Sequence, residues 1–236
     1  MELCGEINKG DLAKQVTMAF KLSSFQGSLS PVGDLYKTMI HCRVHAGINS
    51  FMFDAERPKD KKAEDRAYHE LVKGADHGDF VVYKTFQLVR RDALEDLRRF
   101  VDKYEGGSGK AGIKLVRGAY WDVKRDDVFY MTKKDTDASY NMGMKYALEA
   151  KGIPVCIATH NARSVEIAKS LLKDDKKKDV SFAQLLGMAD GLSNGLVCEG
   201  YRVMKYVPYG APNEMVPYLG RRLVENYKIL EHVIKV

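Results

Sequence analysis

Short β-rich runs alternate with amphipathic segments along most of this chain. Alternation of this kind predicts repeated βα units and a parallel sheet, because parallel neighbours need a crossover that is usually helical. Seven strands are predicted, over residues 16–23, 49–54, 79–85, 111–119, 153–159, 180–185 and 202–207.

The helices predicted between these strands have recognisable starts. One begins with Ser30 as the N-cap and Pro31 at the first helical position. Another starts at Asn161, and a third is capped by Thr136 or Asp135. Their apolar faces are formed by Val165, Ala168 and Leu172 in the second, and by Tyr140, Met144 and Leu148 in the third.

Seven strands are one fewer than a (βα)8 barrel requires. The remaining strand is expected in residues 1–6, unless part of the barrel is missing. An open doubly wound sheet is the competing architecture, but no GxGxxG turn follows any strand. Polar residues at the strand ends favour the barrel, namely Lys21, Asp54, Gln87, Tyr120, His160 and Tyr206. The predicted fold is an α/β TIM-type barrel, complete or incomplete at its N-terminal end, in a single domain of residues 1–236.

The composition fits a globular domain and excludes several partners. The chain has 236 residues, 45% of them hydrophobic, and a formal net charge of +6. The basic excess is spread over turns and interleaved with Asp, which is typical of solvated loops, so nucleic acid binding is not expected. No apolar run approaches the roughly 18 residues of a membrane span, and the N-terminus resembles neither a signal nor a transit peptide.

Four cysteines show no CxxC pairing and no metal-type Cys/His spacing. They are therefore expected to be buried free thiols in a reducing compartment, and no metal site is predicted. The cysteines are Cys4, Cys42, Cys156 and Cys198.

The C-terminal region contains adjacent arginines, Arg221 and Arg222, within a helical pattern. Adjacent helical positions lie about 100° apart, so both guanidinium groups can approach one anion. Together they form a fork suited to one small carboxylate, although an arginine pair in solvent is the simpler alternative. The apolar residues of this pattern are Met215, Leu219, Leu223 and Leu230.

Several long motifs identify the family that this chain resembles. KLVRGAYW at 114–121, ATHN at 158–161, FAQLLGM at 182–188, FDAE at 53–56 and the segment 206–222 are similar to those of the FAD-dependent proline dehydrogenases, in the same order. The variants of the first and third motifs look eukaryote-type. This resemblance implies a flavin-binding barrel that oxidises L-proline.

The resemblance also implies how the substrate is held. Arg221, Arg222 and Lys21 match the positions that face the proline carboxylate, and Asp54 matches the acidic residue of the family site. Asp54 is expected to hold Arg222 or Lys21 by a charge-assisted hydrogen bond, since an unpaired buried carboxylate is costly. Catalytic roles are implied for Asp54 and Lys114.

An aromatic slot is implied for the pyrrolidine ring, formed by Tyr120, Leu185 and Tyr206. Relatives that act on hydroxyproline carry a smaller polar residue at the position that Tyr206 matches. A full phenol leaves little space for a hydroxyl on the ring, so proline is favoured over hydroxyproline.

FAD is the implied cofactor. A cation at Lys114 would contact the isoalloxazine and stabilise the anionic reduced ring. The residues at cofactor-contacting positions are Lys84, Gln87, Lys114, Arg117, Gly118, Ala119, Thr159 and His160. Lys84 departs from the family pattern, since bacterial members carry a flavin-contacting glutamine there, and whether Gln87 replaces it stays open.

The implied reaction transfers a hydride from L-proline to flavin N5 and forms Δ1-pyrroline-5-carboxylate, the first step of proline catabolism. A quinone would reoxidise the flavin. The resemblance further implies a mitochondrial protein with peripheral contact to the matrix side of the inner membrane, or a cytoplasmic one if the source is not a eukaryote. Three alternatives stay open: a hydroxyproline dehydrogenase, a Schiff-base lyase with Lys21 or Lys114 as nucleophile, and a non-catalytic scaffold.

Overall fold

Seven parallel strands form one curled sheet in the computed structural model of the protein, and their order across the sheet follows the chain from β1 to β7. The structure describes residues 2–10, 13, 15–25, 27–55, 60–118, 127–172, 179–207, 216 and 220. The strands are β1 (Met18–Phe20), β2 (Ser50–Phe53), β3 (Val81–Gln87), β4 (Ala111–Val116), β5 (Val155–Ala158), β6 (Val180–Leu185) and β7 (Arg202–Tyr206).

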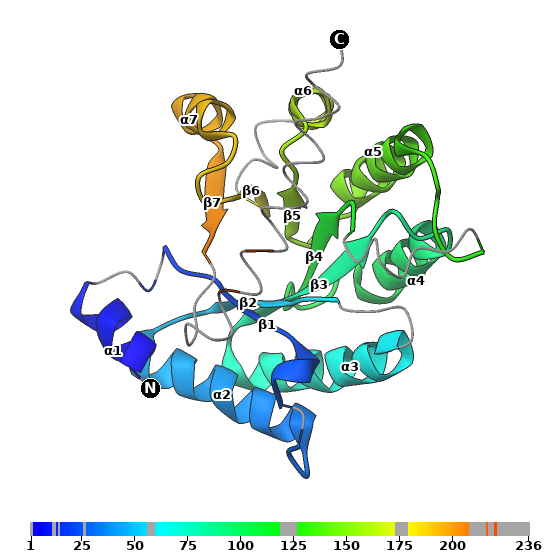
Figure 1. Ribbon diagram of the computed structural model, residues 1–236. Helices are drawn as coiled ribbons and strands as arrows, with labels where there is room; N and C mark the ends of the chain where they lie inside the picture. The colour runs from blue at the N-terminus through cyan, green and yellow to red at the C-terminus, as the bar shows by residue number, and fades with distance from the viewer. Residues whose placement is uncertain are drawn as a thin grey trace.

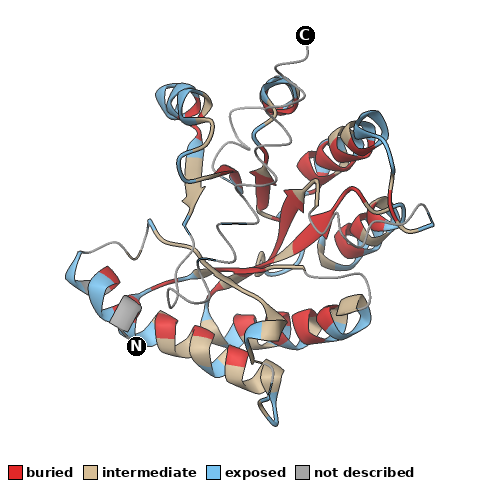
Figure 2. Ribbon diagram, viewed as in Figure 1, coloured by how far each residue is buried: buried red, intermediate tan, exposed pale blue. Residues whose placement is uncertain are grey.

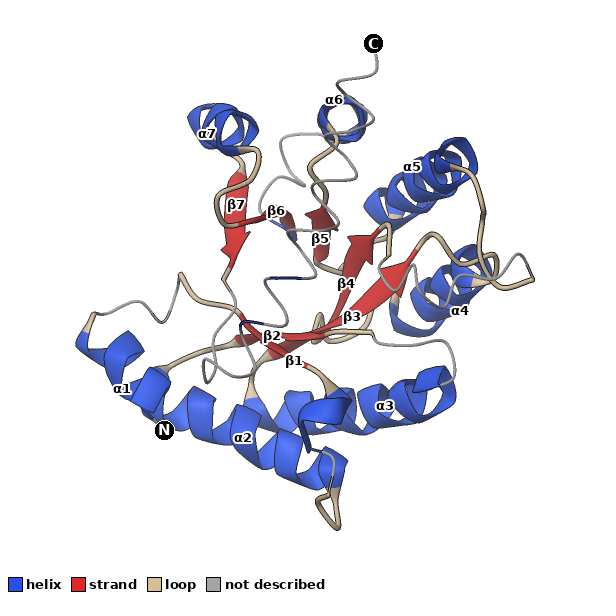
Figure 3. Ribbon diagram, in the orientation of Figure 1, coloured by secondary structure: helices blue, strands red, loops and turns tan. Residues whose placement is uncertain are grey.

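Helices cover the outer side of this curled sheet (Figure 1, Figure 3). All but the first helix follow the strands as crossover connections, which is the βα arrangement that the sequence predicts. The helices are α1 (Glu2–Lys9), η1 (Leu22–Phe25, a 3₁₀ turn), α2 (Pro31–Ala46), α3 (Lys61–Gly78), α4 (Ala93–Tyr104), α5 (Lys133–Glu149), α6 (Ala162–Leu171) and α7 (Asp190–Cys198).

The arc stays open between β1 and β7, since no pairing joins these two strands within the described residues. This confirms the predicted α/β barrel class and its incomplete form. All seven predicted strands are present, with shifted ends. The first is the shortest, because only Met18–Phe20 pair with β2 before the chain turns into η1.

Two apolar clusters lie on the two faces of the sheet. The larger one fills the space between the outer face and the helices, and Figure 2 shows buried residues along the strands and on the inward sides of the helices. The smaller one occupies the concave inner face and consists of Met52, Tyr83, Cys156 and Ala183. Burial on both faces explains why the strands read as continuous apolar runs rather than as alternating ones.

The N-terminal segment is a helix, so the prediction of a strand in residues 1–6 was wrong. Cys4 and Ile7 are three residues apart and both are buried, which is helical spacing for one apolar face. That face packs on α2, where the sulfur of Cys42 lies 3.5 Å from that of Cys4. The four cysteines are free thiols, as predicted, but the prediction that they are buried was wrong for Cys198, which is exposed.

The predicted helix starts are correct in two cases out of three. Ser30 is the N-cap of α2, with Pro31 next, although the Ser30 side chain makes no capping hydrogen bond. Asn161 caps α6, and its side chain accepts the N–H of Ser164. The prediction for α5 was wrong, because Thr132 is the residue that caps this helix. The amphipathic pattern around Arg221 and Arg222 lies outside the described residues, apart from Val216 and Gly220, which are helical and exposed.

Candidate active site

Asp54 lies at the centre of a cluster of polar side chains at the carboxyl ends of the strands. It follows β2 directly, and its N–H donates to the carbonyl of Phe20 (2.8 Å), which ties it to the end of β1. One carboxylate oxygen, Oδ1, accepts Nζ of Lys114 at 2.5 Å and the hydroxyl of Thr85 at 3.2 Å. The other, Oδ2, lies 3.4 Å from the hydroxyl of Tyr206. The carboxylate is thus surrounded by donors from three other strands.

Strand register explains this convergence. Phe53 pairs with Lys84 across β2 and β3, which brings Asp54 level with Thr85, and Thr85 pairs in turn with Lys114. The three side chains therefore form one row on the inner face. The side chains of Lys114 and Asp54 are only 7% and 13% exposed, so this is a nearly buried ion pair. Such a pair carries a large desolvation penalty, which is offset when further hydrogen bonds satisfy it.

Tyr206 faces this pair from the other side of the arc. It is the last residue of β7, and its ring centroid lies 5.3 Å from Nζ of Lys114, within cation–π range. Leu185 ends β6 opposite Tyr206 in the register. A cation, a carboxylate and an aromatic ring therefore share the concave side of the sheet, a combination that can hold a small zwitterion or a polar aromatic ring system.

His160 follows β5 and is fixed by a backbone contact. The N–H of Leu185 donates to Nε2 of His160 at 3.0 Å, so Nε2 is unprotonated in this arrangement. Burial lowers the pKa of His160 below its ordinary value, and the charge of Lys205 lowers it further. The imidazole is accordingly neutral at neutral pH and links the ends of β5 and β6.

Arg117 and Gly118 form the turn after β4. The guanidinium of Arg117 contacts Thr159, which directly follows β5, at 2.6 Å (Nη1 to Oγ1). Gly118 has φ +123°, and a Cβ at this position would lie 2.5 Å from Cγ1 of Val89. Only glycine fits this turn without strain, and its missing side chain lets another group approach the backbone closely.

The structure separates Lys84 from the rest of the predicted site. Lys84 is on the outer face of β3, where Nζ pairs with Asp65 of α3 at 2.7 Å and lies 5.3 Å from the ring of Phe86. Contact with a ligand on the inner face is not compatible with this position. Gln87 is buried and two residues beyond Thr85, so it shares the inner face with the row around Asp54.

The other predicted residues are placed as follows. Lys21 directly follows β1, and no ion pair joins it to Asp54 among the described side chains. The prediction that Asp54 binds Lys21 was therefore wrong, because Asp54 forms its ion pair with Lys114. The remaining predicted site residues lie outside the described part of the chain, namely Ala119, Tyr120, Arg221 and Arg222.

Two contributors were missed by the sequence reasoning. Thr85 donates to Asp54, and Asp137 of α5 pairs with Nε of Arg117 at 2.7 Å. The two-residue spacing of Thr85 and Gln87 along β3 is a signal that could have found the first. Nothing in the local sequence indicates the second, because Asp137 reaches Arg117 from a helix 20 residues further on.

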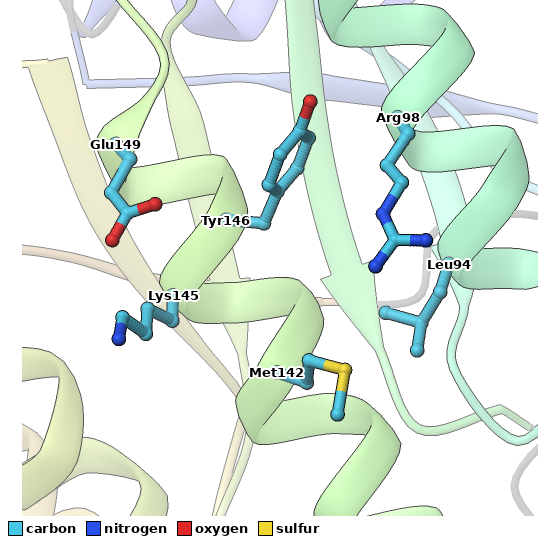
Figure 4. Close-up of a pocket in the computed structure, with 6 residues that line it drawn as sticks. All are labelled: Leu94, Arg98, Met142, Lys145, Tyr146 and Glu149. Atoms are coloured by element: carbon cyan, nitrogen blue, oxygen red, sulfur yellow. The ribbon is translucent and has the colours of Figure 1, made fainter.

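A second concavity lies on the outside of the protein. A hollow of about 140 Å³ lies between α4 and α5. Figure 4 shows the side chains that line it, namely Leu94, Arg98, Met142, Lys145, Tyr146 and Glu149. It belongs to the helix layer and is separate from the strand ends. No group of three or more His, Cys, Asp or Glu suited to a metal ion occurs in the residues that the structure describes. Among these residues, no helix is long and apolar enough to cross a membrane.

Comparison with known proteins identifies relatives of this chain along nearly all of its length. The proline dehydrogenase family model matches residues 4–234. Mitochondrial proline dehydrogenase 1 of Arabidopsis thaliana is 38% identical over 172 residues, which cover 66% of this chain and 34% of that protein. Hydroxyproline dehydrogenase of Homo sapiens is 34% identical over 166 residues, covering 64% of this chain and 36% of that protein. The chain thus spans about a third of the length of these relatives.

The fold has a counterpart among solved structures. Proline utilization A (PutA) from Bdellovibrio bacteriovorus, in a crystal structure of the form inactivated by N-propargylglycine, superposes with a TM-score of 0.75 at 24% identity. The superposition covers 88% of this chain and 24% of that one, and at this identity the likeness concerns the fold. The family model covers nearly all of the sequence, and the chain therefore belongs to the proline dehydrogenase family.

Proposed function

We propose that this chain, as one barrel domain of residues 1–236, oxidises L-proline to Δ1-pyrroline-5-carboxylate with FAD as the electron acceptor. The observation that carries the proposal is the buried Lys114–Asp54 pair beside the ring of Tyr206, at the carboxyl ends of the strands. Enzymes with a parallel barrel assemble their sites at this end. Family membership supports the same reaction class.

The residues at these strand ends suit a flavin. Lys114 offers a fixed positive charge, and Gly118 lets a planar ring system come close to the backbone after β4. Thr159 and His160 would hold the cofactor from the end of β5, and Gln87 from that of β3. When bound, FAD supplies a two-electron acceptor for the hydride that leaves the ring carbon next to the proline nitrogen. A cation near the ring would favour its reduced, anionic form.

The protein's own contribution is to position the substrate. Lys21, Arg221 and Arg222 would bind the proline carboxylate, and Tyr206 and Leu185 would pack on the pyrrolidine ring, together with Tyr120. Fixing the carboxylate and the ring aligns one C–H bond, which converts an encounter in solution into an oriented one. Asp54 holds Lys114 and receives the Tyr206 hydroxyl, so it would orient both groups rather than take a proton. The proline amine needs only to be neutral when the hydride leaves.

Oxidation of hydroxyproline is the second candidate, since a hydroxyproline dehydrogenase is among the relatives. Tyr206 disfavours it, because the phenol lies over the inner face where a ring hydroxyl would need space. A Schiff-base lyase is disfavoured by the engagement of Lys114, whose ammonium group would have to leave Asp54 before attacking a carbonyl.

We also propose a compartment and an electron acceptor. Several relatives carry the word mitochondrial in their names, and we infer the same compartment here, on the matrix side of the inner membrane with peripheral contact. A quinone in that membrane would reoxidise the flavin. Subcellular fractionation and reduction of a soluble quinone analogue by the loaded enzyme would test these two points.

The visible spectrum of the purified protein tests the main proposal. After reconstitution with excess FAD and removal of free flavin, we expect flavin absorption bands that bleach when L-proline is added without oxygen. D-Proline is the matched control and should leave the bands unchanged. A protein that stays colourless sinks the proposal. Adduct formation with borohydride in the presence of a carbonyl substrate, in a colourless protein, would favour the lyase instead.

A further inference from the structure

Arg117 is held by protein groups on nearly every side. Its Nε donates to Oδ1 of Asp137 (2.7 Å), Nη1 to Oγ1 of Thr159 (2.6 Å) and Nη2 to Oγ of Ser164 (2.9 Å). The guanidinium carbon lies 4.2 Å from the ring centroid of Tyr140. One side chain from the turn after β4 thus connects the end of β5 with the N-terminal parts of α5 and α6.

These contacts fix the backbone on both sides of Arg117. The Arg117 carbonyl accepts the N–H of Val89 (2.7 Å), and the turn at Gly118, with its positive φ, follows directly. Thr159 accepts from Arg117 and also from the N–H of Asn161 (3.1 Å), which caps α6. One guanidinium group therefore ties the turn after β4 to the end of β5, in addition to the pairing of the two strands.

Among the residues that the structure describes, Asp137 supplies the only carboxylate paired with that guanidinium. Its second oxygen binds Nζ of Lys133 (2.5 Å). Burial by itself would raise the pKa of Asp137, but the hydrogen bonds from Lys133 and Arg117 lower it below the ordinary value. Asp137 is hence ionised at neutral pH, and a bond from guanidinium to carboxylate is stronger than one to a neutral hydroxyl.

We propose that Asp137 is a positioning residue for the cofactor site: it orients Arg117, which in turn holds Thr159 and the turn at Gly118 in the arrangement that binds FAD. This inference rests on the proposed function. In this role Arg117 organises two strand ends, and its three donor nitrogens are already engaged with protein groups. Without Asp137, two neutral hydroxyls and one ring would have to hold the guanidinium.

A double-mutant cycle tests the proposal. FAD affinity is measured by titrating flavin fluorescence in the wild type, Asp137→Ala, Arg117→Met and the double variant, and thermal unfolding of each protein is followed without FAD. We expect each single change to weaken FAD binding about tenfold, and the double change to weaken it no further than Arg117→Met alone, since residues that act through one another are not additive. Losses that multiply in the double variant would overturn the proposal.

Asp135→Ala is the matched control, because it removes the same charge from the same helix. Asp135 contacts Thr132 and is exposed, so FAD affinity should stay at the wild-type value. Asp137→Glu keeps the charge and should restore part of the affinity; if Asp137→Ala does not fold, Asp137→Glu and Arg117→Lys form the cycle. Asp137→Ala with unchanged FAD affinity overturns the proposal, even if its unfolding temperature falls. If the wild type binds no FAD, the proposed function fails separately, and non-additive unfolding temperatures still report the Asp137–Arg117 coupling.

Discussion

Nζ of Lys114 lies 2.5 Å from Oδ1 of Asp54, although the two residues are 60 positions apart in the chain. Both side chains are nearly buried. The pair is supported by the hydroxyls of Thr85 and Tyr206. It lies on the inner face beside apolar side chains such as Met52 and Ala183. This arrangement links the stability of the barrel to the chemistry of its site.

Replacing one partner of this pair should destabilise the fold strongly. Lys114→Met leaves the Asp54 carboxylate buried without its cation, which we expect to lower the free energy of unfolding by about 3–5 kcal/mol. Urea denaturation measures this loss. Lys110→Met is the matched control, because Lys110 pairs with Asp79, which is exposed, and should change stability little. Equal losses in the two variants would show that the inner pair is not effectively buried.

Tyr206 should decide between proline and hydroxyproline. Tyr206→Ser removes the ring that lies over Lys114 and opens a polar gap, so kcat/KM for proline should fall while the ratio of hydroxyproline to proline activity rises. Tyr206→Phe is the control: it keeps the ring and loses only the hydroxyl near Asp54, so the ratio should stay as in the wild type. An unchanged ratio in Tyr206→Ser, with flavin still bound, would remove Tyr206 from the substrate pocket.

The arginine pair should act on substrate affinity. Arg221→Met or Arg222→Met each removes one charge-assisted hydrogen bond to the proline carboxylate, and KM should rise about tenfold or more with FAD content unchanged. Steady-state kinetics and flavin absorbance measure the two quantities. Arg98→Met on the outer surface of α4 provides the control and should leave KM as it is. Unaltered kinetics in both single variants would argue against the clamp.

The turn at Gly118 should not accept a side chain. Gly118→Ala combines φ +123° with a contact of 2.5 Å to Val89, and we expect a loss of about 1–3 kcal/mol in unfolding free energy together with weaker FAD binding. Gly195→Ala in α7 is the matched control. A Cβ there meets no atom within 4 Å, so the change should stabilise the helix by up to about 1 kcal/mol. If Gly118→Ala changes neither the unfolding free energy nor FAD binding, the turn can relax to accept a side chain.

Stability should fall as the pH drops below the ordinary histidine range. Burial lowers the pKa of both His160 and His69 in the folded state, so the unfolded state binds protons more readily once the pH falls below about 6.5. The contribution of the two neutral imidazoles to the free energy of unfolding is complete above that pH. It is lost as the pH falls towards their lower pKa values in the folded state. Each group can contribute a slope of at most about 1.4 kcal/mol per pH unit.

Unfolding free energies measured between pH 7.5 and 5 would check this, with about four points per pH unit fixing the slope. His160→Gln and His69→Gln should each flatten the curve, and the double variant should flatten it most. His77, which is exposed near the end of α3, is the control, and His77→Gln should leave the slope unchanged. A slope that is the same in all variants would assign the acid sensitivity to carboxylates instead.

Much of the fold follows from the order of residues along the chain. Apolar runs separated by helical segments predict parallel strands, and the seven strands occur at the expected places. The residues at or just past the ends of those strands, such as Asp54, His160 and Tyr206, gather because the carboxyl ends of parallel strands lie at one end of a barrel. These features depend on local periodicity and on chain direction, which a sequence records directly.

Tertiary packing decided the rest. Lys84 and Lys114 both interrupt apolar strands, and a strand buried on both faces has no alternation from which the inner side could be read. Only the register of β2, β3 and β4 assigns Lys114 to Asp54 and turns Lys84 towards Asp65. The N-terminal segment shows the same limit. Its helix is held by the packing of Cys4 and Ile7 against α2, and this contact is made only in the folded protein. Partner choice between distant residues is a property of the packed structure, and the local sequence carries no record of it.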